Sequence, residues 1–357
     1  MLREATTATT ALRAATGWLL DRQDAAGWWS GELETNVTMT AEHVLLLRFL
    51  GLDLDPIQAG AIQHILGNQR ADGSWALYYA GPADLSTTIE AYVALKVLGL
   101  DPGHEAMGRA LRVIHQQGGL ARARVFTKIW LALFGEYPWA GIPSMPPELV
   151  YLPPRAPLNL YDFACWARGT IAPLLIVLSH RPRRPLGVPL GELIVPGTAG
   201  ELSRVPGSGF FWWTDKLLKG YDRLPRQPGR DQARARLVDW IVARQEADGS
   251  WGGIQPPWVY SLIALNLEGF PLDHPVMRCG LAGLDGFALE DETGWRLQAC
   301  MSPVWDTAWA VLALRRAGLP QDHPALSRAV DWLLAEQITS GGDWQVRCRE
   351  RACGGWA

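Results

Sequence analysis

The segment Trp240-Ile-Val-Ala-Arg-Gln245, followed by Gly249-Ser250-Trp251, decides the fold because its pattern recurs along the chain. Each copy ends a stretch rich in aromatic and aliphatic residues with Gln and continues into Gly-x-Trp. The further copies are Trp18–Gln23 with Gly27–Trp29, His64–Gln69 with Gly73–Trp75, and Trp332–Gln337 with Gly342–Trp344; a degenerate copy is Gln117–Gly119. Gln23 and Gln69 lie 46 residues apart, and Gln245 and Gln337 lie 92 apart, or twice 46, so one unit is about 46 residues long.

A repeat of this length predicts two helices. The stretch before each Gln carries apolar residues at helical spacing, and Gly-x-Trp ends that helix because Gly adopts the left-handed cap conformation. A second, more apolar helix follows each stop and ends at a glycine; these helices are predicted over Thr40–Leu50, Thr87–Leu98, Trp258–Leu267 and Val304–Leu314. One amphipathic and one nearly apolar helix per repeat predict an all-α fold, an α/α toroid with outer helices facing water and inner helices facing one another.

The recurring Gln and Trp are interpreted as a clamp. A Gln side chain can bond free backbone groups at a helix end, and a Trp ring can cover the end of the next helix. The chain has 18 Trp, more than its 8 Phe and 8 Tyr combined, and we expect most of them to be structural. In particular, Trp75, Trp251 and Trp344 are predicted at helix ends near Gln69, Gln245 and Gln337.

Composition excludes several classes of protein. The chain of 357 residues has 33 Lys and Arg against 36 Asp and Glu, and this net charge of −3 argues against a nucleic-acid partner. Its five cysteines lack CxxC spacing, so we expect a reducing cytoplasm and neither a disulfide scaffold nor a metal site. The amino terminus has no apolar core typical of a signal peptide. The longest apolar run, Ile171–Leu178, is too short to span a bilayer.

Two stretches interrupt the repeat. Gly141–Leu158 and Arg181–Pro228 are rich in Pro, Gly and Arg and are predicted to be long surface connections. Within the second, Gly209–Leu224 reads GFFWWTDKLLKGYDRL. Two interpretations stay open: a helix that packs its aromatic stripe on the core, or an interfacial segment that dips into a bilayer. In the second, Phe210, Phe211, Trp212 and Trp213 enter the membrane while Lys216 and Lys219 lie at the headgroups.

Four stretches together resemble the squalene-hopene cyclase family, which belongs to the class II terpene cyclases. They are LSTTIEAYVALKVLG (85–99), RVFTKIWLALFGEYPW (124–139), GSWGGIQPPWVYSLIAL (249–265) and SPVWDTAWAVLAL (302–314). The resemblance runs from about residue 10 to residue 344. It implies one complete α/α barrel plus part of a second: 34–300 as the second barrel, with a membrane-facing insertion near 207–224, and 1–33 and 301–357 as parts of the catalytic barrel.

The activity that the resemblance implies is polycyclisation of squalene or a related polyprenyl hydrocarbon. Protonation of a terminal alkene starts the reaction, and proton loss or water capture ends it, with no cofactor. The resemblance places the protein peripherally on the cytoplasmic face of the cell membrane. Carried over by position, the residues of the central cavity and its walls are Trp166, Ile254, Gln255, Pro256 and Trp305, and those of a polar cluster near the end of the reaction are Glu42, Glu90, Arg124 and Trp130.

Aromatic faces suit this chemistry because they stabilise a carbocation without supplying a nucleophile. Structural interpretations stand beside the functional ones. A buried carboxylate such as Glu42 or Glu90 usually bonds a neighbouring helix or an arginine. Asp306 is a candidate for orienting catalytic groups, but an Asp near a helix start is usually a cap. Trp166, taken alone, is a core tryptophan.

The acid that starts the family's reaction comes from an Asp-x-Asp-Asp motif, which this sequence lacks. The nearest strings, Asp53-Leu54-Asp55-Pro56 and Glu290-Asp291-Glu292, have neither its spacing nor its context. We therefore interpret the chain as an amino-terminal portion of a cyclase, inactive alone and prone to dimerise. The alternative is a non-catalytic α/α toroid that binds isoprenoids or partners. A glycosidase pairing Glu42 or Glu90 with Asp306 is a third hypothesis, disfavoured because sugar sites need many polar walls.

Overall fold

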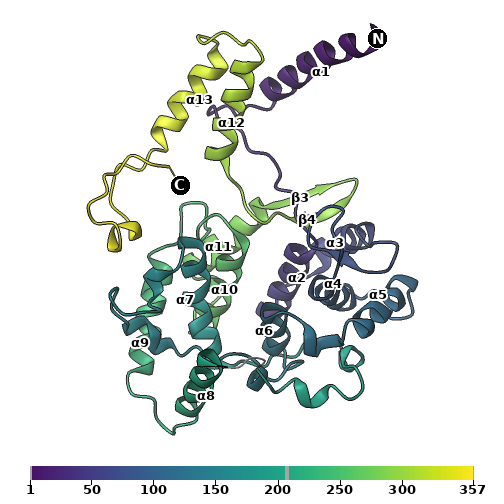
Figure 1. The fold of residues 1–357 in the computed structure, drawn as a ribbon, viewed down its shortest axis with the longest axis vertical. Helices are drawn as coiled ribbons and strands as arrows, with labels where there is room; N and C mark the ends of the chain where they lie inside the picture. The colour runs from purple at the N-terminus through teal and green to yellow at the C-terminus, as the bar shows by residue number, and fades with distance from the viewer. Residues whose placement is uncertain (1, 206–208, 357) are drawn as a thin grey trace. The chain divides into compact units, whose positions relative to one another are not determined.

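The computed structural model describes residues 2–205 and 209–356, with side chains from residue 7 onward, and divides the chain into two compact units. Unit 1 joins Met1–Leu33 to Cys300–Ala357, and unit 2 is Glu34–Ala299. Figure 1 shows the elements of both. The assignment of these units to a catalytic and a second barrel stays a prediction.

The described residues are mainly helical, as predicted. The α-helices are α1 (Leu2–Asp21), α2 (Thr38–Leu50), α3 (Asp55–Gly67), α4 (Leu85–Val97), α5 (Glu105–Gln116), α6 (Val125–Leu133), α7 (Cys165–His180), α8 (Phe210–Asp222), α9 (Arg230–Val242), α10 (Gln255–Leu267), α11 (Pro275–Gly286), α12 (Pro303–Arg316) and α13 (Pro324–Ala335). Short 3-10 helices are η1 (Gly119–Arg122), η2 (Trp139–Gly141), η3 (Pro147–Tyr151), η4 (Leu160–Asp162), η5 (Gly191–Leu193), η6 (Ala199–Glu201) and η7 (Asp343–Val346). Two antiparallel ribbons pair β1 (Trp75–Ala76) with β2 (Ala83–Asp84), and β3 (Ala288–Asp291) with β4 (Gly294–Leu297).

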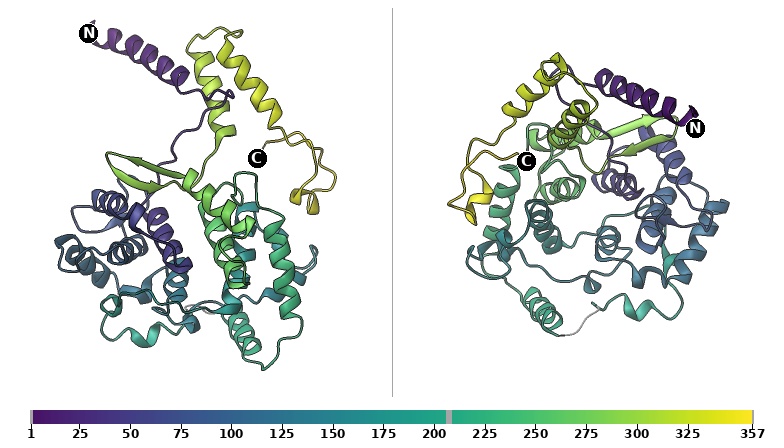
Figure 2. Two further views of the ribbon diagram at one scale, coloured as in Figure 1. Left: turned by 180° about the vertical axis from the view of Figure 1, so that it is seen from behind. Right: turned by 45° about the horizontal axis from the view of Figure 1, so that its top comes forward.

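The helices of unit 2 alternate between an inner and an outer layer, which confirms the predicted α/α class. The inner helices α2, α4, α6, α7 and α10 pack against one another, and α3, α5, α9 and α11 lie outside them (Figure 2). The most apolar helices are also the most buried, since the nearly apolar α4 and α10 are buried along most of their length. The predicted glycine stops are confirmed at both, because Gly99 and Gly269 have φ of 85° and 91°, a left-handed conformation that favours glycine.

The Gln clamp is present, and its two bonds join consecutive outer helices. Gln69 Nε2 donates to the Gly73 carbonyl at 3.0 Å, in the turn that ends α3, and to the Ala106 carbonyl at 2.9 Å, in the first turn of α5. Gln245 does the same between α9 and α11, and Gln23 between α1 and α13.

The indole N–H of each clamp tryptophan bonds its own outer helix, and the ring of Trp251 also lies against Gly280 on the next outer helix, α11. The indole N–H of Trp75 donates to the Ile65 carbonyl at 2.8 Å, and Trp251 donates to the Ile241 carbonyl at 2.7 Å. In both copies the tryptophan lies six residues after the clamp glutamine and bonds the carbonyl four residues before it.

The fourth clamp uses a different tryptophan from the one predicted. Gln337 donates to the Gly354 carbonyl at 2.8 Å, and the Trp356 indole donates to the Leu333 carbonyl at 2.6 Å. The prediction of Trp344 was wrong, because the local match Gly342–Trp344 lies in an inserted segment that contains η7. Backbone bonds between Ile338 and the residues Gly354 and Gly355 reproduce the turn of the other copies.

Unit 1 has a small core of its own. Trp29, Leu314, Leu326 and Ala329 are buried together, with Leu19 and Leu20 packed against them. The Thr307 hydroxyl accepts from the Trp29 backbone N–H at 2.9 Å and so ties the start of the chain to α12.

The predicted surface connection Arg181–Pro228 is only partly exposed. Leu186, Leu190 and Leu193 within it are buried. Arg48 on the inner helix α2 donates to the Leu186 carbonyl at 2.8 Å and so attaches the segment to that helix. The irregular backbone therefore covers part of unit 2.

We predict that the clamp is a main source of stability. Gln69→Leu leaves the Gly73 and Ala106 carbonyls without their partner and removes the acceptor of Arg109. The free energy of unfolding, measured by urea denaturation, should fall by about 2–4 kcal/mol. Gln116→Leu replaces an exposed glutamine of the same unit and should change it by less than about 0.5 kcal/mol. Equal effects of the two substitutions contradict the clamp.

Candidate functional site

A buried polar cluster lies among the inner helices of unit 2. Glu42 on α2 and Glu90 on α4 are both buried, although their neighbours along each helix are mostly apolar. Gln255, the first residue of α10, donates from Nε2 to Glu42 Oε2 at 3.1 Å. Arg124, just before α6, donates to Glu90 Oε2 at 3.2 Å. The structure therefore brings together residues from four elements.

Arg124 is held in place by its own backbone and by two neighbouring side chains. Its N–H donates to the Ser86 hydroxyl at 2.9 Å, and its guanidinium also donates to the Thr87 hydroxyl at 3.2 Å. The Thr127 hydroxyl donates to the second oxygen of Glu90. Glu90 thus has a partner on each carboxylate oxygen.

Burial raises the pKa of both carboxyls, because the charged form is poorly solvated in the interior. Desolvation, reinforced by the negative charge of Glu90, raises the pKa of Glu42 to about 8, while the hydrogen bond from Gln255 opposes the rise. Desolvation also raises the pKa of Glu90, against the opposing effects of Arg124 and Thr127. The cluster therefore retains a proton at neutral pH.

An aromatic wall borders the carboxyls. The rings of Trp130 on α6 and Tyr260 on α10 have centroids 5.6 Å apart, and Phe126 lies 6.3 Å from Tyr260. Trp130 Nε1, the Tyr260 hydroxyl and Gln255 Oε1 are buried and have no hydrogen-bond partner among the described residues. Unpaired buried polar groups of this kind are usually satisfied by ordered water or a ligand.

The remaining predicted residues of unit 2 flank α7 and α10. Ile254 and Pro256 are half-buried on either side of Gln255, whose backbone N–H donates to the Ala299 carbonyl at 2.9 Å. Trp166 lies in the first turn of α7 and is 60% exposed, so the interpretation of it as a core tryptophan is wrong.

Asp306 and Trp305 lie on α12 of unit 1. Asp306 accepts a hydrogen bond from the Gly31 N–H at 2.9 Å and therefore has a structural role. Trp305 is 64% exposed and contacts Trp309, with ring centroids 5.9 Å apart. Both tryptophans are apolar surface on this unit.

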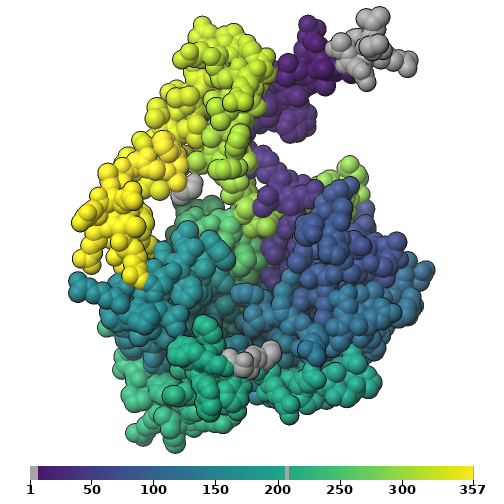
Figure 3. Space-filling model, in the orientation of Figure 1, coloured from purple at the N-terminus to yellow at the C-terminus, as the bar shows by residue number. Residues whose placement is uncertain are grey.

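Helix α8 carries the aromatic segment. Its part of the chain, coloured teal-green, lies on the face of the molecule that Figure 3 shows. Phe210, Phe211 and Trp213 are about 70% exposed, so this stripe is not packed on a core. Trp212 is the exception; it is half-buried, and the Lys216 ammonium lies 4.3 Å from its ring centroid. Within the described residues, none of the helices is both long and apolar enough to cross a membrane.

Sequence reasoning missed two members of the cluster, Thr127 and Tyr260. Tyr260 lies on the predicted apolar helix Trp258–Leu267, and Thr127 lies in the stretch 124–139, which was quoted only for the family resemblance. Tyr260 is five residues after Gln255. A polar residue inside such a nearly apolar helix is the signal that was available.

Comparisons with known proteins agree with this architecture. The model of the squalene-hopene cyclase N-terminal domain matches residues 12–293, and that of the C-terminal domain matches residues 301–357. A squalene-hopene cyclase of Alicyclobacillus acidocaldarius is 48% identical over 97% of this chain and 56% of its own length. A dammaradiene synthase of Dryopteris crassirhizoma is 37% identical over 92% of the chain and 49% of its own length.

A squalene-hopene cyclase of Zymomonas mobilis is 34% identical over 97% of the chain and 55% of its own length. The chain thus spans about half the length of the curated relatives that it matches. Because a single domain model covers most of unit 2 and a second covers the end of the chain, this chain belongs to the squalene-hopene cyclase family.

Proposed function

We propose that this chain supplies part of a cyclase that converts squalene, or a related polyprenyl hydrocarbon, into a polycyclic product. The observation that carries the proposal is the buried carboxyl cluster of Glu42 and Glu90 beside the aromatic wall of Trp130 and Tyr260. A carbocation has no counterion in an apolar cavity, and aromatic faces stabilise it without trapping it. A nearby negative group then offers a place for the charge to be discharged.

We assign the end of the reaction to this cluster. The final cation is discharged when a neighbouring carbon loses a proton, or when water adds and then loses a proton. Either route releases one proton that a base must accept. Two carboxyls in one low-dielectric site titrate as a pair, so the Glu42–Glu90 pair accepts this proton as a unit. The unpartnered Trp130 N–H and Gln255 Oε1 support a water molecule held beside it.

The predicted substrate contacts and the domain roles are part of the same proposal. We assign substrate contact to Trp166, Ile254, Gln255, Pro256 and Trp305, and a supporting role to Asp306. The exposure of Trp166 and Trp305 supports contact with something outside each unit. The exposed apolar residues Trp309 and Leu312 also support a homodimer that covers α12.

We further propose that the protein attaches peripherally to the cytoplasmic face of the membrane through α8. A hydrocarbon substrate partitions into bilayers, so the enzyme must meet it there. The exposed Phe210, Phe211 and Trp213 form the kind of aromatic surface that inserts at an interface. Family membership disfavours the alternative of a non-catalytic isoprenoid-binding toroid, and the aromatic wall disfavours a glycosidase.

We predict that the chain alone does not convert squalene, because no Asp-x-Asp-Asp acid is present to protonate an alkene. Fusion to the carboxyl-terminal remainder of the Alicyclobacillus relative should restore pentacyclic product, detected by gas chromatography of the lipid extract. In that fusion, Glu42→Gln or Glu90→Gln should change the ratio of alcohol to alkene products. Glu292→Gln, which alters an exposed carboxylate, should leave that ratio unchanged.

Each arm tests one part of the proposal. Product from the chain alone shows that another group starts the reaction. An active fusion whose product ratio is unaffected by either Glu variant removes the cluster from the terminating step.

We predict that stability falls with rising pH because of Glu42. Its carboxyl keeps its proton to about pH 8 in the folded state, against 4.5 for its ordinary value. Between these values the folded state binds more protons, so deprotonation favours unfolding. The slope should reach up to about 1.4 kcal/mol per pH unit. Glu42→Gln, which has no proton to lose, should flatten it.

Urea denaturation above pH 6.5 separates this effect from that of His43. Burial lowers the pKa of His43 to about 4, and stability linked to that residue is lost only as pH falls below its ordinary 6.5. The control Glu292→Gln should retain the wild-type slope. A slope that Glu42→Gln does not change contradicts the buried, protonated carboxyl.

We predict that α8 binds bilayers. The double variant Phe211→Ser and Trp213→Ser should reduce sedimentation with phosphatidylcholine vesicles about tenfold or more, because insertion free energy scales with the apolar area buried. The control is Tyr78→Ser with Tyr79→Ser, which removes two exposed aromatic rings outside α8. Equal loss in both variants, or none in either, rules out α8 as the attachment site.

A further inference from the structure

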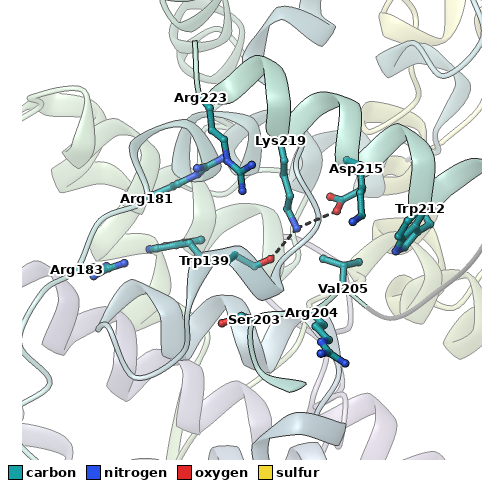
Figure 4. Close-up of a pocket in the computed structure, with 12 residues that line it drawn as sticks. Trp139, Arg181, Arg183, Ser203, Arg204, Val205, Trp212, Asp215, Lys219 and Arg223 are labelled. Atoms are coloured by element: carbon teal, nitrogen blue, oxygen red, sulfur yellow. Dashed lines mark hydrogen bonds and ion pairs between the residues drawn. The ribbon is translucent and has the colours of Figure 1, made fainter. Parts of the chain in front are cut away.

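A cationic cleft of about 640 Å³ lies between α8, the segment after α7 and the segment before residue 206 (Figure 4). Six cationic side chains line it, and one carboxylate, so its formal charge is +5 (six minus one). The cations are Arg181, Arg183, Arg204, Lys216, Lys219 and Arg223, and the carboxylate is Asp215. The chain as a whole has a net charge of −3, so this concentration of positive charge is local.

Three of these cations are already occupied. Lys219 bonds Asp215 at 3.0 Å and the Ala140 carbonyl at 2.8 Å, as the dashed lines in Figure 4 show. Arg181 pairs with Asp222 at 2.6 Å, and Lys216 stacks on Trp212. These contacts fix one wall of the cleft.

The other three cations are exposed arginines. Among the side chains that the structure describes, in residues 7–205 and 209–356, no carboxylate pairs with Arg183, Arg204 or Arg223. Like charges gathered without counterions repel one another, so their placement around one cleft is unfavourable unless an anion joins them. A guanidinium donates two parallel hydrogen bonds, which match the oxygens of a phosphate group.

The cleft and the exposed aromatic surface lie on different faces of α8. Phe210, Trp213 and Leu217 are spaced by three and four residues and form the exposed apolar face. Trp212, Lys216 and Lys219, with the same spacing, line the cleft. A helix of 3.6 residues per turn rotates by about 100° per residue, which puts these two rows on different sides of α8. One helix therefore presents both an apolar surface and a cationic wall.

We propose that this cleft binds a phosphate group through Arg183, Arg204 and Arg223. An anionic phospholipid headgroup and a soluble phosphate ester offer the same chemistry. The apolar face of α8 favours the headgroup, and this choice of source rests on the proposed membrane attachment. Phosphate recognition itself does not depend on that attachment.

The first arm of the test uses soluble ligands. Isothermal titration calorimetry of the full chain with inorganic phosphate and with glycerol 3-phosphate measures the affinity of the cleft. The triple variant R183Q/R204Q/R223Q should lose binding, and circular dichroism checks that it folds. The matched control R112Q/R155Q/R278Q changes the net charge equally, at exposed arginines outside the cleft, and should bind like wild type.

The second arm uses vesicles of phosphatidylcholine with and without phosphatidylglycerol. Wild type should bind the anionic vesicles more tightly. The cleft variant should lose about 100-fold in affinity for them, because each of the three removed charges contributes about 1 kcal/mol, or about fivefold. Its binding to pure phosphatidylcholine should be unchanged. The control variant should lose at least about tenfold less than the cleft variant.

The outcomes separate the two proposals. Cleft-dependent binding of anionic vesicles identifies a lipid headgroup as the ligand. If the chain binds soluble phosphate through the cleft but binds no vesicles, the phosphate site is supported with a soluble ligand. The same result contradicts membrane attachment. Equal losses in the cleft and control variants, or no phosphate binding in either arm, overturn the cleft proposal even where α8 binds neutral vesicles.

Discussion

A single side-chain amide, the Nε2 group of each repeat glutamine, fixes the distance between neighbouring outer helices. It binds one carbonyl in the turn that ends one outer helix and one in the first turn of the next, as Gln245 does at Gly249 and Val276. The approach is close enough that only glycine fits. A Cβ on Gly249 would lie 2.2 Å from the Cys279 carbonyl oxygen, and its φ of 90° is left-handed. The sequence pattern Gln, Gly, Trp therefore reflects one packing requirement, the close approach of consecutive outer helices.

Fixing the outer helices in this way determines the environment of the inner ones. Helices α2, α4 and α10 are covered on nearly every side, so any polar residue on them loses its water. Glu42 and Glu90 have this position, and Arg124 offers the charge that compensates them only in part. The raised pKa values follow from the ring architecture more than from any local feature of either glutamate. Only Glu90 bonds Arg124, and burial raises the pKa of Glu42 to about 8.

Local periodicity was enough to predict α2, α4, α10 and α12 with their glycine ends, because those signals lie within a dozen residues, but it did not predict the inner helices α6 and α7. It failed at Trp344. The segment Gly342–Trp344 matches the Gly-x-Trp pattern close to the expected position, but the clamp uses Trp356. An insertion separates Trp356 from the clamp glutamine, and a short sequence pattern does not reveal it. Tyr260 and Thr127 were missed because their importance comes from neighbours on other helices. The cationic cleft was missed for the same reason: Arg183, Arg204 and Arg223 are separated in sequence and meet only when α8 folds back beside the segment after α7.

The two faces of α8 also explain why an aromatic run was hard to interpret from sequence. Four consecutive aromatic residues cannot share one side of a helix, because successive residues are rotated by about 100°. Trp212 therefore leaves the exposed group and joins Lys216 in the cleft, while Phe210 and Trp213 stay outside. An uncharged hydrocarbon offers a protein only apolar area, which gives no orientation at a surface. In the proposed membrane attachment, charge recognition beside the apolar face supplies that orientation, because a charged group stays at the aqueous boundary of a bilayer while aromatic rings enter it.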